Sequence, residues 1–205
     1  MPKSQKKTGR LAISGARPNY SAGEIASRER GMWYSLNGMA LPNPDLVLKR
    51  LGKDITVYSE LLVDAHVGGC VDSRKAGTLS LTWAIDRGKA QSDAATLVED
   101  AFLRLDMRRI ISEILDAPLF GYNVSEVIWG EQRGRVLPLD IRQKPPEWFH
   151  FGEKAELRFK SIDQPVRGED VPPRKFLKAV HGGGWRNPYG FPVLSKIFWP
   201  ATFKK

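Results

Sequence analysis

The chain has 205 residues, of which 41% are hydrophobic and 27% are charged, and its net charge at pH 7 is +9. These values are ordinary for a globular protein and exclude a wholly disordered chain. No stretch approaches the ~20 consecutive apolar residues that span a bilayer, and the N-terminal sequence MPKSQKKTGRLAIS lacks the apolar block of a signal peptide, so we expect an intracellular protein with no membrane contact. A single cysteine, Cys70, excludes an internal disulfide and a cysteine-rich metal site.

Residues 1–40 are predicted to form a basic and mobile N-terminal arm. Within residues 1–30, seven Lys and Arg residues outnumber two Glu residues, so that this stretch carries +5 of the net charge. Such a charge favours contact with nucleic acid or an acidic surface. Two interpretations stay open, namely an arm that binds DNA or a partner and a tail that only keeps the chain soluble. The residues proposed for DNA or partner contact are Lys3, Lys6, Lys7, Arg10 and Arg17.

Three helices are predicted between residues 41 and 79. LPNPDLVLKRLG offers Asn43 as the cap, Pro44 in the first turn and Gly52 at the end. The following stretch, ITVYSELLVDAHVGGCVDSRKAGTL, has helical apolar spacing in two pieces that separate near Asp64, which favours two short helices.

The period changes to that of a strand in SLTWAIDRG, where Leu81, Trp83 and Ile85 alternate with smaller or polar residues. From Ser92 the helical period returns and continues to a stop before Pro118 and Gly121. This is the longest helical region of the chain, and we expect it to be the main packer of the core. The residues that carry this pattern are Val98, Ala101, Leu105, Ile110, Ile111, Ile114 and Leu115.

The region beyond Gly121 is predicted to be mainly antiparallel sheet. YNVSEVIWGEQRGRVLPLDIR indicates a hairpin whose turn is EQRGR, and WFHF, ELRF and KFLKAVH are three further short strands. The segregation of helices before this point and strands after it predicts an α+β fold, with a helical N-terminal half packed on the sheet.

The last segment is predicted to be a turn, HGGGWRNPYG, followed by a helix that begins at Phe191 and Pro192. Leu194, Ile197, Phe198 and Ala201 form its apolar stripe, and Pro200 should kink it. The domains expected are therefore an arm over 1–40, an α+β domain over 41–190 and the start of a helix over 191–205. Residues proposed to pack on another subunit or on a stem are Leu194, Ile197, Phe198, Trp199 and Phe203.

The sequence offers little that indicates catalysis, a cofactor or a metal. The glycines of HGGGWRNPYG lack the spacing of a phosphate-binding loop, and the favoured interpretation is a plain turn. His66, His150 and His181 are dispersed, and Cys70 is interpreted as a small helix residue in preference to a nucleophile. The carboxylate pairs, which are Glu99 with Asp100 and Glu113 with Asp116, are interpreted as solvated helix faces in preference to acid–base pairs. We therefore predict that the protein is not an enzyme.

Aromatic residues are frequent in the second half of the chain and are interleaved with Lys and Arg. A core role is favoured, because their spacing gives each a buried face. The alternative is a free-standing basic nucleic-acid-binding module that stacks bases on residues such as Trp148 and Phe151.

Four segments in a consistent order carry a resemblance to a known family. They are CVDSRKAGTLSLTW (Cys70 to Trp83), LFGYNVSEVIW (Leu119 to Trp129), PPRKFL (Pro172 to Leu177) and NPYGFPVLSKIFWPATFKK (Asn187 to Lys205). From Pro42 onward the chain resembles the portal proteins of Mu-type tailed phages and related prophages.

The resemblance implies a structural protein without catalytic residues, the head-tail connector of a virion. It implies a twelve-subunit ring at one capsid vertex, through which a terminase drives double-stranded DNA and to which scaffold, capsid and tail-connector proteins bind. The protein would then lie in the virion or, during assembly, in the host cytoplasm. The quoted motifs would belong to the α+β wing of such a subunit. Portal relatives continue past FWPATFKK into channel-lining helices, so the resemblance also implies a truncated or partial form.

Overall fold

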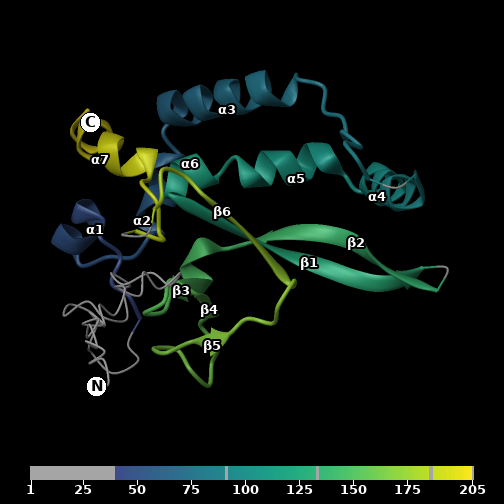
Figure 1. Ribbon diagram of the computed structural model, residues 1–205. Helices are drawn as coiled ribbons and strands as arrows, with labels where there is room; N and C mark the ends of the chain where they lie inside the picture. The colour runs from purple at the N-terminus through teal and green to yellow at the C-terminus, as the bar shows by residue number, and fades with distance from the viewer. Residues whose placement is uncertain (1–39, 91, 133, 185–186, 205) are drawn as a thin grey trace, which may run out of the picture.

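The computed structural model describes residues 40–90, 92–132, 134–184 and 187–204, and it has the α+β architecture that the sequence predicts. Strands β1, β2 and β6 form an antiparallel sheet with β1 in the centre, and β3, β4 and β5 form a second, smaller sheet. Figure 1 shows α3 and α5 above the larger sheet and the smaller sheet below it. The elements are α1 (Leu46–Leu51), α2 (Val57–Leu61), α3 (Ala65–Leu79), α4 (Ser92–Arg104), α5 (Met107–Ile114), α6 (Ala117–Phe120), β1 (Tyr122–Gln132), β2 (Arg135–Lys144), the short 3-10 helix η3 (Pro146–Trp148), β3 (Phe149–Phe151), β4 (Leu157–Phe159), β5 (Glu169–Asp170), β6 (Phe176–Val180) and α7 (Val193–Phe203).

The predicted hairpin and the three further strands are confirmed. β1 and β2 pair from Val124 opposite Lys144 to Gln132 opposite Arg135, so the turn falls within EQRGR as expected. WFHF, ELRF and KFLKAVH contain β3, β4 and β6. The two-residue strand β5 was not predicted, because it lies in a polar segment without alternation and forms only by pairing with β4.

Helix α1 is confirmed, but its predicted cap is wrong. Asp45, and not Asn43, caps the helix, because its Oδ1 accepts the backbone N–H groups of Val47 at 2.8 Å and Leu48 at 3.4 Å. Asn43 instead accepts the N–H of Asp45 at 3.0 Å, which shapes the turn ahead of the helix. Gly52 ends α1 in the left-handed region, as predicted.

The predicted break near Asp64 is also confirmed. α2 ends at Leu61, and the Asp64 side chain accepts the N–H groups of His66 and Val67, both at 3.0 Å, to start α3. The hydrogen bond from the Val67 N–H lowers the pKa of the Asp64 carboxyl most, and the hydrogen bond from the His66 N–H and the positive charge of Lys204 lower it further.

The strand predicted for SLTWAIDRG is wrong. Residues 80–90 form an irregular linker between α3 and α4, and no described strand pairs with them. Leu81 is 72% exposed and Trp83 is 42% exposed. Apolar and polar residues do alternate here, but a strand also needs the edge of another strand to pair with. Within the described residues, no strand lies beside this segment.

The helical region after Ser92 exists, but it is not the main core packer. It breaks into α4, α5 and α6, and Pro118 lies inside α6 instead of ending the region. Its buried residues Leu105 and Ile110 pack with Val127 and Ile141 in a small cluster on the larger sheet. Val98, expected on the buried face, is 45% exposed. The larger cluster joins α1, α2 and α7 to β1 and β3 around Tyr58, Val124, Phe149, Phe151 and Leu194.

The predicted turn between β6 and α7 is confirmed where it is described, and it makes a close backbone contact with Gly121. The His181 N–H donates to the Gly121 carbonyl at 2.9 Å, and the Phe191 N–H donates to the His181 carbonyl at 2.9 Å. Tyr189 closes the turn over the core, because its hydroxyl donates to the Leu41 carbonyl at 2.7 Å. Gly190 adopts φ +71°, and a Cβ there would lie 2.6 Å from the His181 carbonyl oxygen.

We expect Gly190→Ala to lower the free energy of unfolding by about 2–3 kcal/mol, since it combines a left-handed backbone with a backbone clash. Urea denaturation measures this loss. The control is Gly77→Ala near the end of α3, where a Cβ meets nothing within 4 Å. That variant should gain roughly 0.5–1 kcal/mol from helix propensity. Equal effects at the two positions would contradict the role given to Gly190.

A second prediction concerns pH. His150 is buried on β3, and its Nε2 lies 2.8 Å from the Arg167 carbonyl oxygen. Burial lowers the pKa of His150, so the folded state binds fewer protons than the unfolded state below about pH 6.5. The stability that neutral His150 provides is complete above that pH and is lost as the pH falls toward the folded pKa. We expect the urea midpoint to fall between pH 7.5 and 5.5.

The variant His150→Gln tests whether His150 causes that fall. A glutamine amide keeps a donor for the Arg167 carbonyl but does not titrate. The difference between the urea midpoints at pH 7.5 and pH 5.5 should be smaller in this variant than in the native chain, whatever the variant's stability at pH 7.5. An unchanged difference would assign the pH dependence to other groups.

Candidate functional site

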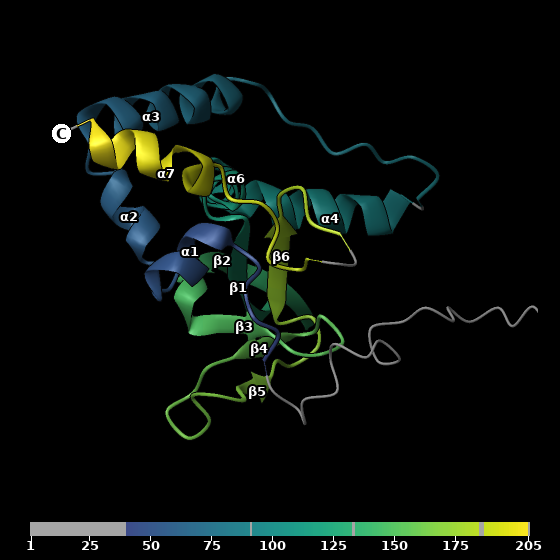
Figure 2. The same cartoon turned by 90° about the vertical axis from the view of Figure 1, so that its left-hand side faces the viewer.

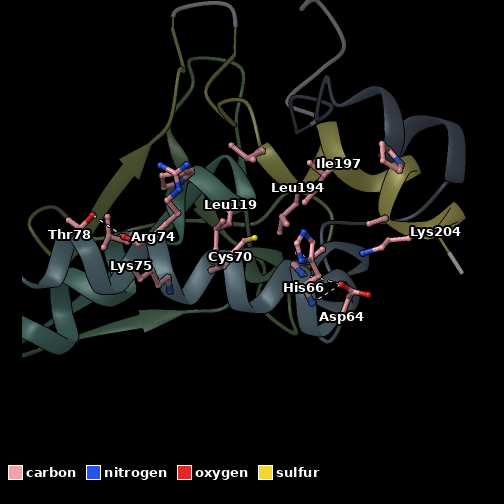
Figure 3. Close-up of a pocket in the computed structure, with 17 residues that line it drawn as sticks. Asp64, His66, Cys70, Arg74, Lys75, Thr78, Leu119, Leu194, Ile197 and Lys204 are labelled. Carbon is pink, nitrogen blue, oxygen red and sulfur yellow. Dashed lines mark hydrogen bonds between the residues drawn. The ribbon is translucent and has the colours of Figure 1, made fainter.

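An apolar groove of about 690 Å³ lies between α3, α6 and α7. We call it the α3–α7 groove. Figure 3 shows Cys70 and Leu119 near its middle, with Asp64 and Lys204 toward one end and Arg74 and Thr78 toward the other. Its lining residues are Asp64, His66, Val67, Cys70, Val71, Arg74, Lys75, Thr78, Leu115, Pro118, Leu119, Val193, Leu194, Ile197, Pro200, Ala201 and Lys204.

The wall on α3 follows from the spacing of its residues. Val67 is buried and Val71, Lys75 and Leu79 are half-buried at intervals of four, so one row of the helix faces the protein. The row directly before it, which is His66, Cys70, Arg74 and Thr78, is exposed and lines the groove. Most of the surface of α3 is therefore exposed. Its exposed row forms the wall of the groove that faces α7.

One ion pair connects α3 to Asp116, which is itself hydrogen-bonded to the sheet. The Lys75 ammonium lies 2.5 Å from Asp116, and the other oxygen of Asp116 accepts the Gln143 side-chain amide at 2.9 Å. Glu113 accepts Arg109 at 2.8 Å and the Gln143 backbone N–H at 3.0 Å. The interpretation of Glu113 and Asp116 as a solvated face is therefore wrong, because both carboxylates connect helices to β2.

The charged groups of the groove are mostly basic. Arg74, Lys75 and Lys204 outnumber Asp64, so the lining carries a net charge of +2 with histidine neutral. An apolar floor with a cationic margin suits an apolar segment that carries acidic groups.

The groove also places His66 and Cys70 together, as residues one helical turn apart on α3. His150 lies in the small sheet and His181 follows β6, so the three histidines do not converge. Within the described ranges, no group of three or more His, Cys, Asp and Glu residues is arranged to hold a metal ion.

A second exposed apolar surface lies at the other end of the molecule. Figures 1 and 2 both show α4 and the linker before it far from α7. Leu81 and Trp83 of the linker and Val98 and Leu103 of α4 are exposed there. α4 has three acidic residues and one basic residue, a net charge of −2 in a chain whose total is +9.

The residues predicted for contacts are distributed unevenly. Lys3, Lys6, Lys7, Arg10 and Arg17 fall outside the described residues. Leu194 and Phe198 are buried in the chain's own core, Ile197 and Trp199 pack partly against it, and Phe203 is 77% exposed. α7 thus docks on its own chain, and Phe203 is the most accessible of the five.

The aromatic residues lie mainly in the core, which is the role that the sequence favours for them over base stacking. Tyr122, Phe149, Phe151 and Tyr189 are buried, and the Phe151 and Tyr189 rings meet edge to face with centroids 4.7 Å apart. Phe151 therefore has no free face for a nucleobase. Trp148 remains exposed, but the aromatic sheet required by the nucleic-acid-binding alternative is packed inside the protein.

Sequence reasoning did not identify the α3–α7 groove. The signal was present as the row His66, Cys70, Arg74 and Thr78, which repeats every four residues beside the apolar row. A row of this kind is ordinary on a solvated helix, and only the position of α7 opposite it makes it the wall of a groove.

A family model described as the portal protein of Mu bacteriophage matches residues 55–205. This match covers the groove, the linker and both sheets. No curated protein matches the chain.

Proposed function

Because this chain belongs to the Mu bacteriophage portal-protein family, we propose that it is a structural subunit of the head-tail connector at a capsid vertex. Subunits would form a ring, twelve in number by the resemblance, around a channel for double-stranded DNA. The observation that carries the proposal is the family match over 151 residues, and an α+β fold with a large apolar groove supports it. The protein would act without a cofactor and would not be an enzyme.

The proposed contacts follow from this role. A channel must let DNA slide, so binding should use phosphates through screened and sequence-independent attraction. The basic residues of 1–40 and the net charge of +9 support such contact. Residues 41–190 would form the wing-like domain, and residues 191–205 the start of a helix toward a stem, with terminase, scaffold, capsid and tail-connector proteins as further partners.

Light scattering on the purified chain, followed by electron microscopy of negatively stained particles, tests the ring. Discrete annular particles of one mass would support the proposal, and a monomer at all concentrations would contradict it. A salt titration of binding to two unrelated DNA duplexes tests the channel contacts. We expect equal affinities that fall steeply with salt. Affinity that depends on Trp148 and resists salt would instead favour the nucleic-acid-binding module.

A further inference from the structure

The linker between α3 and α4 presents apolar side chains that its own fold does not cover. Leu81, Trp83 and Ile85 alternate along it, and Leu81 and Trp83 are exposed. Exposed tryptophan in an apolar segment is typical of a protein interface, where Trp is among the residues that contribute most to affinity.

Both ends of this linker are fixed to neighbouring helices. At one end, an Arg108 guanidinium N–H donates to the Leu79 carbonyl at 3.2 Å. At the other, the Arg87 guanidinium donates to both oxygens of Glu99 on α4, at 2.7 Å and 2.5 Å. The apolar middle of the linker is therefore held between two anchored points, and a partner would not have to order a free chain.

The linker with α4 and the α3–α7 groove are complementary surfaces. Lys75 is paired with Asp116 and Glu99 with Arg87. Apart from these two pairs, the apolar groove has a net charge of +1, and α4, which follows the linker, has a net charge of −1. The linker leaves α3 at the Thr78 end of the groove and runs away from α7 toward α4 (Figures 1 and 2), so Trp83 is not among the residues that line the groove of its own chain.

Two different surfaces that fit one another produce a head-to-tail interface, which closes into a ring when the rotation between subunits allows it. We propose that the α3–α7 groove receives the linker of the next copy of this chain, with Trp83 as the anchor and α4 beside the cationic margin. This inference rests on the proposed ring, and it names the two surfaces through which neighbouring subunits contact one another.

Because Cys70 lies in the groove and is the chain's only cysteine, chemical cross-linking tests the contact directly. Chains with the native Cys70 are mixed with tagged Cys70→Ser/Ala84→Cys chains, in which the thiol lies beside Trp83, and a short bismaleimide is added. We expect a covalent dimer that contains one chain of each kind. The matched control, Cys70→Ser/Ile162→Cys, places the thiol on a fully exposed loop residue and should give no such dimer.

Two further variants separate this contact from chance collision. Ala84→Cys alone leaves both thiols in one chain, and head-to-tail contact then gives a ladder of trimers and larger products, whereas a twofold contact stops at dimers. Trp83→Ala in the Ala84→Cys partner should lower the dimer yield at least about tenfold. Because Trp83 lies in an irregular linker, its loss should leave the fold intact, which circular dichroism verifies.

The outcomes separate this inference from the proposed function. Annular particles without the Cys70 to Ala84→Cys product would overturn the pairing of these surfaces and leave the ring in place. The cross-linked ladder without annular particles would support the pairing and contradict the closed ring. Dimers between native Cys70 thiols alone, or equal yields with Ile162→Cys, would overturn the head-to-tail contact.

Discussion

Replacing Asp45 by alanine is expected to lower the free energy of unfolding by about 3–4 kcal/mol, through the loss of a helix cap together with two side-chain partners. One oxygen of Asp45 caps α1 and accepts the Ser195 hydroxyl at 3.0 Å, and the other accepts the Tyr58 hydroxyl at 2.6 Å. Asp45 is buried, so water does not replace these bonds.

The Tyr58 hydroxyl is the group that makes this loss large. Tyr58 is fully buried, and burial, followed by its hydrogen bond to Asp45, raises the pKa of Tyr58 far above its ordinary value. The phenol stays protonated and needs an acceptor. In Asp45→Ala this hydroxyl loses its carboxylate acceptor and keeps only the neighbouring Ser195 hydroxyl as a partner, which costs about 1–3 kcal/mol in addition to the lost cap.

Urea denaturation of Asp45→Ala, Tyr58→Phe and the double variant measures the contributions of the helix cap and of the buried hydroxyl to the free energy of unfolding. The double variant should be less destabilised than the sum of the two single variants, because Tyr58→Phe removes the donor that Asp45→Ala deprives of its carboxylate acceptor. Asn43→Ala, which removes a hydrogen bond outside the helix, is the control and should cost well under half as much as Asp45→Ala. Strict additivity would contradict the proposed role of the buried hydroxyl.

The parts of the fold that were predicted correctly depend on short-range signals. Gly52 ends α1, Asp64 separates α2 from α3, and EQRGR turns the hairpin, because each of these preferences is set by residues within about one turn. The prediction of Asn43 as the cap was wrong, because Asp45 accepts the first N–H groups of α1 and is also fixed from outside the helix. Asp45 is held by Ser195, which is 150 positions away in the chain.

The two errors in reading periodicity share one cause, since a periodic pattern shows that a face is buried without showing what covers it. The alternation in Leu81, Trp83 and Ile85 is that of a strand, but this chain supplies no described partner edge. The helical pattern from Ser92 to Leu115 predicts the main core, but its residues Leu105 and Ile110 form only a small separate cluster with the larger sheet. The main core instead forms where α7 returns to α1 and α2, a contact that no local signal predicts.

That return of α7 leads to the second large effect, which is expected for Phe198→Ala. Phe198 is 7% exposed, and its ring meets Tyr58 of α2 edge to face with centroids 6.3 Å apart. Truncating a buried phenylalanine leaves a cavity and should lower the free energy of unfolding by about 3–5 kcal/mol. Urea denaturation monitored by circular dichroism gives the value.

Phe203→Ala is the matched control, because it removes the same side chain from the same helix at a position that is 77% exposed. Phe203 stacks on Trp199 with centroids 5.6 Å apart, so a loss within about 0.5 kcal/mol is expected. If the two variants were equally stable, α7 would not be docked on the core in solution. The α3–α7 groove would then lose the wall formed by Leu194 and Ile197, so the stability of Phe198→Ala also tests whether the groove exists in the free chain.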